Sequence, residues 1–265
     1  MKRKLNTASL CMLIILLSFS ACQGMKTTAS DQNSFGSQNG VESEEPQVYT
    51  EPDDIKIMLD ELERLRWEQW LAQPGWWHEQ KVIQSQSGNL HGTSAEWWFQ
   101  HSDAATCPMI LQIIYQEDGQ VLETSVLISE SKIPTVSQNV GASGAENGVL
   151  LVKIPDQSCP QLLESSLEHI KQMLNDSTTL KSAQAVIQDG ALTITLSQEE
   201  EPYRQEITVT IDTASGFITY EKVQLYVNNR ENPEGEIEYN YLHQHYDELP
   251  SEIQNQLDQG LAKLQ

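Results

Sequence analysis

Two histidines are the residues whose types and spacing come nearest to a metal site. His243 and His245 are two apart in a segment predicted to be a strand, so both imidazoles are expected on one face of it. Two ligands do not complete a metal site, and the sequence assigns no third, so a hydrogen-bonded surface pair is the alternative. The sequence contains no nucleophile elbow, phosphate loop, HExxH or dinucleotide motif. It therefore selects no catalytic residue and predicts no cofactor.

Tryptophans are the other residues with a distinctive distribution. All six fall in one predicted helix and two predicted strands: Trp67, Trp70, Trp76, Trp77, Trp97 and Trp98. The four in strands form two neighbouring pairs, and neighbours on a strand point to opposite faces. Each pair is therefore expected to place one ring inward, in the core, and one outward. Outward rings could contact a lipid, a glycan or a partner, because indole combines apolar area with one donor. The candidate contacts are Trp76, Trp77, Trp97 and Trp98.

The first residues have the order of a secretory signal. Three basic residues are followed by an apolar run from Leu10 to Phe19 and then by small residues. The ending Ser20-Ala21-Cys22 resembles the bacterial lipobox, although Phe19 stands where Leu, Val or Ile is usual. The resemblance implies that Cys22 becomes the first mature residue and carries acyl chains such as palmitate; the alternative is an ordinary signal peptide with a chance cysteine. The apolar run is too short for a bilayer-spanning helix, which needs about 20 residues. We therefore expect an extracytoplasmic protein of the cell envelope, anchored to the membrane by lipid.

Charge excludes one class of partner. The formal net charge is −22, and removing residues 1–21, with three basic residues and no acidic one, makes it −25. A surface this acidic repels nucleic acid. Nucleic-acid binding is therefore not expected.

Two further cysteines remain in the mature chain. Cys107 and Cys159 are expected to form a disulfide, because export permits one and no third thiol competes. Closing that loop would stabilise the fold by about 4 kcal/mol. Two free thiols are the alternative, and the lack of a CxxC motif argues against a redox enzyme.

The remaining sequence divides into a tether and one domain. Residues 22–52, with the lipidated cysteine first, are rich in small polar residues and are predicted to be a flexible tether. Residues 53–265 are predicted to form one α+β domain of about ten antiparallel strands with three helices. The helices are expected from 53 to the Pro74-Gly75 stop, over 160–175 and over 251–264. The strands are expected at 76–84, 95–101, 109–115, 121–129, 149–154, 183–188, 191–197, 205–212, 217–228 and 236–246.

The order of these elements resembles that of the LolA/LolB/RseB superfamily of exported lipid-binding and sensor proteins. The segments that carry the resemblance are 74–78, Glu96-Trp97-Trp98, 211–218 and 246–250. The resemblance implies an antiparallel half-open β-barrel with helices packed on or inside it and an apolar cavity. Because the carrier of the family is soluble, a lipidated chain fits a LolB-like or unassigned lipoprotein better.

Three functions follow from these observations. The first is a lipid-anchored binding protein for an apolar ligand or a lipoprotein or lipid partner. The second is a structural or sensory lipoprotein whose core is filled and which binds a protein partner, as RseB does. The third is a metal-dependent enzyme that uses the face of His243 and His245, although the sequence favours a protein that is not an enzyme.

Overall fold

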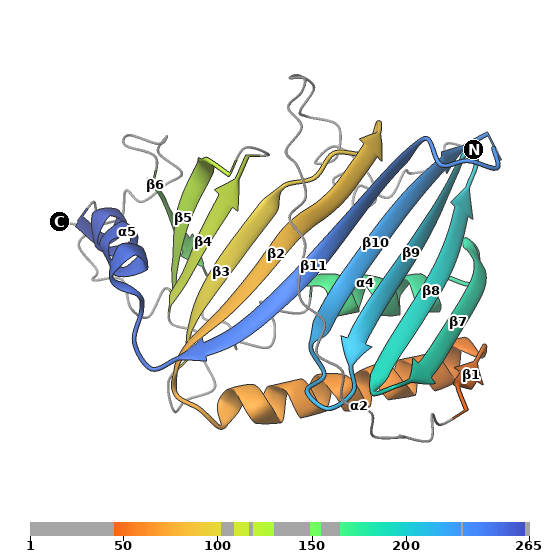
Figure 1. Cartoon of the computed structure of the whole chain (residues 1–265), viewed down its shortest axis with the longest axis horizontal. Coiled ribbons are helices and arrows are strands. Elements are labelled where there is room, and N and C mark those ends of the chain that lie inside the picture. Colours follow the sequence, from red (N-terminus) through yellow and green to blue (C-terminus); the bar gives the residue numbers. More distant parts are fainter. Residues whose placement is uncertain are drawn as a thin grey trace, which may run out of the picture.

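The computed structural model describes residues 45–101, 109–116, 119–129, 149–154, 165–228 and 230–262. In these ranges eleven strands form one sheet, and three helices pack against it (Figure 1). The predicted α+β class is confirmed, and the sheet is antiparallel except for one strand pair. The described sheet is open, with β1 and β6 at its two edges. The predicted leader and Cys22, Cys107 and Cys159 lie outside the described residues.

Apart from β1, the sheet consists of two groups of sequential strands that meet in its middle. The first contains β7 (Leu180–Gln188), β8 (Ala191–Glu200), β9 (Tyr203–Asp212), β10 (Ile218–Val227) and β11 (Gly235–Tyr246). The second contains β2 (Gly75–Gly88), β3 (Ser94–His101), β4 (Met109–Tyr115), β5 (Val121–Ser129) and β6 (Val149–Ile154). Antiparallel pairing of β11 with β2, from Gly235 opposite Gly88 to Tyr246 opposite Trp76, joins the two. Segments far apart in sequence thus become neighbours at the centre of the sheet.

Two details differ from the sequence predictions. The tether was expected to continue through residue 52, but β1 (Gln47–Tyr49) pairs with β7 and therefore belongs to the sheet. Pairing with an existing edge lets so short and polar a segment form a strand. The other difference is β6, which pairs with β5 in parallel rather than antiparallel orientation. A parallel pair needs a connection of about a dozen residues or more, and segment 130–148 supplies that length.

The helices lie on both faces of the sheet. They are α2 (Pro52–Leu71), α4 (Ser165–Asn175) and α5 (Ser251–Leu261), near the predicted positions. We call the face that carries α2 and α4 the inner face and the opposite face, which carries α5, the outer face. None of the helices in the described part of the chain is long and apolar enough to cross a membrane.

The inner face of β7–β10 is filled by α2 and α4. Ile55 and Leu59 of α2 and Leu167 and Ile170 of α4 are buried against inward residues of these strands, which are Ala185, Leu192, Ile194, Leu196, Ile207, Val209, Ile211 and Ile218. Figure 1 shows these strands passing in front of α4, with α2 crossing their ends. The outer face of the same strands is polar, with threonines paired across β8 and β9. This alternation is typical of a sheet with one buried face.

The connection between β7 and β8 is a two-residue hairpin turn. Asp189 and Gly190 both have positive φ, 51° and 78°, as a two-residue type I′ turn requires. The Asp-Gly pair therefore sets the register of the two strands, in which Gln188 lies opposite Ala191.

Strands β2–β5 are covered on both faces. Trp98, Leu111, Ile113 and Val126 pack on the outer face with Leu257 of α5. On the inner face Phe99 and Ile110 pack with aromatic residues of α2. Burial on both faces explains why β4 is apolar almost throughout rather than alternating.

Candidate functional site

The two neighbouring tryptophans of β2 are buried on opposite faces. Trp76 packs in the outer cluster under α5, and Trp77 packs in the inner cluster against α2. Their exposed fractions are 9% and 8%. The prediction of opposite faces is confirmed. The rings on the outer face, Trp76 and Trp98, are both buried. A tertiary contact, the docking of α5, covers the outward rings.

The inner tryptophans form an aromatic cluster at the end of α2. It contains Trp67, Trp70, Trp77, Trp97, Phe99 and Phe217, together with Ile110 and Leu127. The Trp70 ring lies 5.2 Å from that of Trp77 and 5.3 Å from that of Phe99, and the Trp77 indole donates a hydrogen bond to the Trp70 carbonyl. Trp67 and Trp97 are only half-buried. The inner aromatic cluster therefore combines a packed centre with two rings that retain accessible surface.

Beside the aromatic cluster, Glu79 faces His243. Glu79 lies opposite Trp97 on one side and opposite His243 on the other, all on the inner face. His243 Nε2 lies 2.8 Å from the Ile218 carbonyl and donates to it, while Nδ1 is 3.6 Å from a Glu79 oxygen. Burial raises the pKa of the Glu79 carboxyl to about 7, although Arg66 and Lys81 oppose the shift. Burial also lowers the pKa of His243 to about 4, so the imidazole is neutral near pH 7.

A second set of charged side chains lies next to this pair. Lys81 Nζ is 2.7 Å from a Glu221 oxygen and 3.8 Å from the centroid of the Tyr239 ring. Tyr241 donates to the same Glu221 carboxylate. Arg66 of α2 is buried, with its guanidinium 5.3 Å from the Trp67 ring centroid. Ionisable side chains from β2, β10, β11 and α2 therefore lie close together on the inner face. Groups with shifted pKa values, here Glu79 and His243, often lie in functional sites.

The predicted histidine pair does share one face, but its two members have different partners. His243 Nε2 meets the Ile218 carbonyl, whereas His245 Nε2 lies 3.1 Å from the Pro74 carbonyl. Among the described residues, no group of three or more His, Cys, Asp or Glu side chains could hold a metal ion. Each imidazole is hydrogen-bonded to a backbone carbonyl, which is the arrangement given above as the alternative to a metal site.

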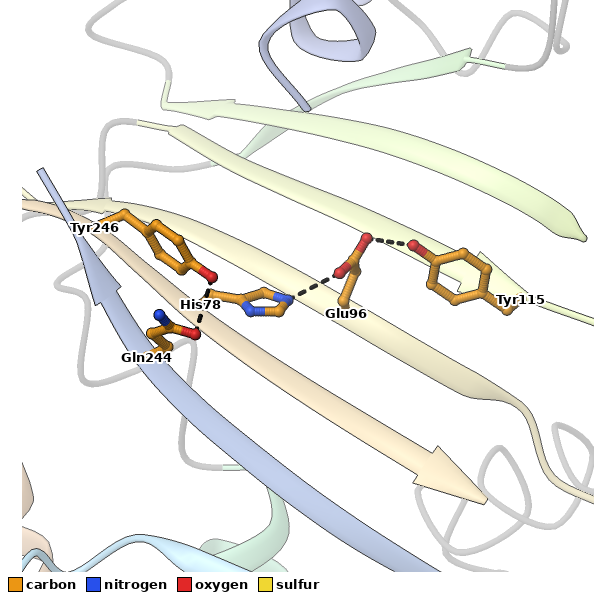
Figure 2. A network of polar contacts seen from close by, with 5 residues as sticks. All are labelled: His78, Glu96, Tyr115, Gln244 and Tyr246. Atoms are coloured by element: carbon orange, nitrogen blue, oxygen red, sulfur yellow. Dashed lines mark hydrogen bonds and ion pairs between the residues drawn. The ribbon is translucent and has the colours of Figure 1, made fainter. Parts of the chain in front are cut away.

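A separate polar network lies on the outer face (Figure 2). His78 Nε2 is 2.8 Å from a Glu96 oxygen, and Tyr115 donates to the other oxygen of that carboxylate. The His78 ring stacks on Trp98 with centroids 4.0 Å apart. Burial raises the pKa of Glu96, but the hydrogen bonds from His78 and Tyr115 outweigh burial and hold that pKa below its ordinary value. The network joins β2, β3 and β4 beneath α5, so its clearest consequence is structural.

No site role was assigned to Glu79 or Arg66 from the sequence, and Glu96 and His78 were noted only as parts of segments that carry the resemblance. One signal was present: Glu79 and Lys81 occupy the same face of β2 as Trp77, in positions that a simple core strand would fill with apolar residues. Their partners on β10 and β11 are far away in sequence. Only the pairing of β11 with β2 brings them together.

Comparison with known proteins adds no family. No protein-family model matches the sequence, and no curated protein matches it.

Proposed function

We propose that this chain is a lipid-anchored extracytoplasmic binding protein whose ligand is held on the inner face. The single observation that carries the proposal is the inner aromatic cluster with its two half-buried rings, Trp67 and Trp97, beside ionisable groups. Small-molecule sites in proteins are mostly apolar and aromatic, with a few convergent polar groups. The lipobox-like segment ending at Cys22 supports the anchor, and the open sheet carrying inner helices supports a half-open barrel.

The ligand would occupy only part of the inner face. Because α2 and α4 pack against β7–β10, the accessible aromatic surface is on the side of β2 and β3. An apolar group lying against Trp97 would reach the Glu79 position, since the two residues are cross-strand neighbours. The proposed site therefore has an apolar wall and a polar end.

The packing of α2 and α4 favours a second candidate. A core filled by its own helices suits a structural or sensory lipoprotein that binds a protein partner, and the cluster on β7–β10 is of that kind. The two candidates make different predictions: a ligand-binding protein takes up an apolar molecule next to Trp97, whereas a filled-core protein does not.

A titration with a hydrophobic fluorescent probe tests the proposal. The full chain carrying Cys22→Ser avoids detergent and serves as the reference protein. We expect saturable quenching of tryptophan fluorescence, weakened by Trp97→Ala and unchanged by Leu242→Ala, a large side chain that is 52% exposed. Native mass spectrometry of protein from its own membranes should show a retained ligand.

Two results would contradict the proposal. No saturable quenching and no retained ligand would leave the filled-core candidate. A metal-dependent hydrolytic activity lost on His243→Ala would instead make the chain an enzyme.

A further inference from the structure

A row of side chains crosses the inner face at the position of Trp97. On β3 this residue lies directly opposite Glu79 of β2 and opposite Gln112 of β4. Gln112 in turn lies opposite Ser125 of β5. Directly paired residues on neighbouring strands point to the same face of the sheet, and Figure 1 shows the four strands side by side. A half-buried indole therefore has a carboxyl on one side and an amide on the other.

Both polar groups beside Trp97 have accessible surface. Gln112 is half-buried, as Trp97 is, and 20% of the Glu79 side chain is exposed. The Gln112 amide donates and accepts hydrogen bonds, and the Glu79 carboxyl accepts them in either protonation state. Ser125 ends the row, because it is buried and its hydroxyl donates to Glu123. A molecule bound next to Trp97 thus meets hydrogen-bonding groups on two opposite sides.

The two polar groups limit the width of the apolar surface at Trp97. Neighbouring strands are about 4.8 Å apart, so Glu79 and Gln112 are separated by about 10 Å across the sheet. An alkyl chain crossing the row would take both polar side chains out of water without offering them hydrogen bonds, which is unfavourable. Along β3 the neighbours on the same face are Ala95 and Phe99, which are buried and apolar. The row therefore suits a molecule with a narrow apolar surface and polar groups at two opposite edges.

We propose that the inner site binds a neutral sugar, which packs the C–H groups of one ring face on Trp97 and bonds through its hydroxyls to Glu79 and Gln112. This inference rests on the proposed function and names its class of ligand. A pyranose ring has apolar C–H groups on its faces and hydroxyls around its edge, and each hydroxyl both donates and accepts. Indole offers apolar contact area to such a face. A neutral sugar is favoured over an acidic one because the protein has a net charge of −22.

Uncharged amphiphiles of one chain length separate sugar recognition from apolar binding. The probes are octyl glucoside, octyl galactoside and octyl mannoside, and octyl tri(ethylene glycol) ether has the same chain without a sugar. Each is titrated below its micelle concentration into the Cys22→Ser chain, with tryptophan fluorescence as the signal. We expect at least one glycoside to bind about tenfold more tightly than the ether, because two additional hydrogen bonds contribute a factor of about this size. The corresponding methyl glycosides distinguish a free sugar, which binds equally well without the chain, from a glycolipid, which does not.

Gln112→Met is the decisive variant, and Gln80→Met is its matched control. Met keeps the length and the apolar stem of Gln but lacks the hydrogen-bonding amide. Gln80 is also half-buried but lies on the outer face, because it follows Glu79 on β2. We expect Gln112→Met to lose the preference for the glycoside and to keep its affinity for the ether, which shows that the variant is folded. The control should keep both.

Saturation-transfer NMR of the bound glycoside gives a second measurement that needs no variant at the site. The ring C–H protons should receive more saturation than the terminal methyl group of the chain, and the reverse order overturns the inference. Equal binding of the glycosides and the ether, or a preference that survives Gln112→Met, also overturns it and leaves the proposed function intact. Failure of the glycosides, the ether and the hydrophobic fluorescent probe to bind overturns both.

Discussion

Glu79 and Trp97 are paired directly across β2 and β3 on the inner face, while their neighbours His78 and Trp98 are paired, and stacked, on the outer face. Because neighbouring residues on a strand point to opposite faces, these two strands place a carboxyl and an indole on the inner face and an imidazole and an indole on the outer face. The inner pair retains accessible surface, whereas the outer pair is buried under the cover of α5. This difference is the reason why we propose the inner face for ligand binding and a structural role for the outer pair.

Removing the Tyr115 hydroxyl should weaken the outer network. Tyr115→Phe deletes a hydrogen bond to the buried Glu96 carboxylate, and a bond to a charged group contributes about 1.5–3 kcal/mol. The matched control is Tyr246→Phe, because that hydroxyl donates to the exposed Gln244 amide and should contribute less than about 1 kcal/mol. Urea unfolding of both variants measures the difference, and equal losses would contradict the role given to Glu96.

The Glu96 carboxylate should also make the free energy of unfolding depend on pH. Because the folded pKa of Glu96 lies below its unfolded value of about 4.3, its contribution is complete above that pH and is lost as pH falls through the lower folded value. Glu96→Gln should therefore be less stable than the wild type near neutrality and should lose less stability between about pH 5 and pH 3. Parallel unfolding curves across that interval would refute the assignment.

Local patterns predicted much of this fold, and long-range contacts account for what they missed. The alternation in β9 and the Asp189-Gly190 turn between β7 and β8 are local signals, and the strands predicted at these three positions are confirmed. The burial of Trp76 depends on α5, and the Glu79 site depends on β11, which is joined to β2 only by sheet pairing. Cross-strand partners more than a hundred residues apart leave no periodic signal in either segment. A charged residue in phase with a buried tryptophan was the sole hint of the site.

The anchor is tested at Cys22. Cys22→Ser should release the protein from membranes and abolish labelling by palmitate, because the thiol that would be acylated is gone. Cys11→Ser, within the apolar run, is the control and should leave both unchanged. Retention of the Cys22 variant in the membrane fraction would show that another feature holds the protein.

The disulfide remains a prediction, because Cys107 and Cys159 lie outside the described residues. Non-reducing peptide mapping should recover the two in one linked peptide. Replacing either with serine should then lower the free energy of unfolding by about 4 kcal/mol, and replacing both should cost no more than one. Alkylation of both as free thiols in native protein would disprove the pairing.

Glu79 and Glu221 should respond oppositely to neutralisation. Since the folded pKa of Glu79 is raised to about 7, its protonated form is favoured in the fold, and stability is lost as pH rises from about 4.3 through 7. Glu79→Gln removes that loss and should stabilise the ligand-free protein at about pH 8 by up to about 3.5 kcal/mol. Glu221→Gln should destabilise it at the same pH, because the carboxylate accepts from both Lys81 and Tyr241. Denaturant unfolding of the two variants at about pH 5 and pH 8 separates these effects. Destabilisation by Glu79→Gln at the higher pH would mean that the carboxyl is ionised and paired in the fold.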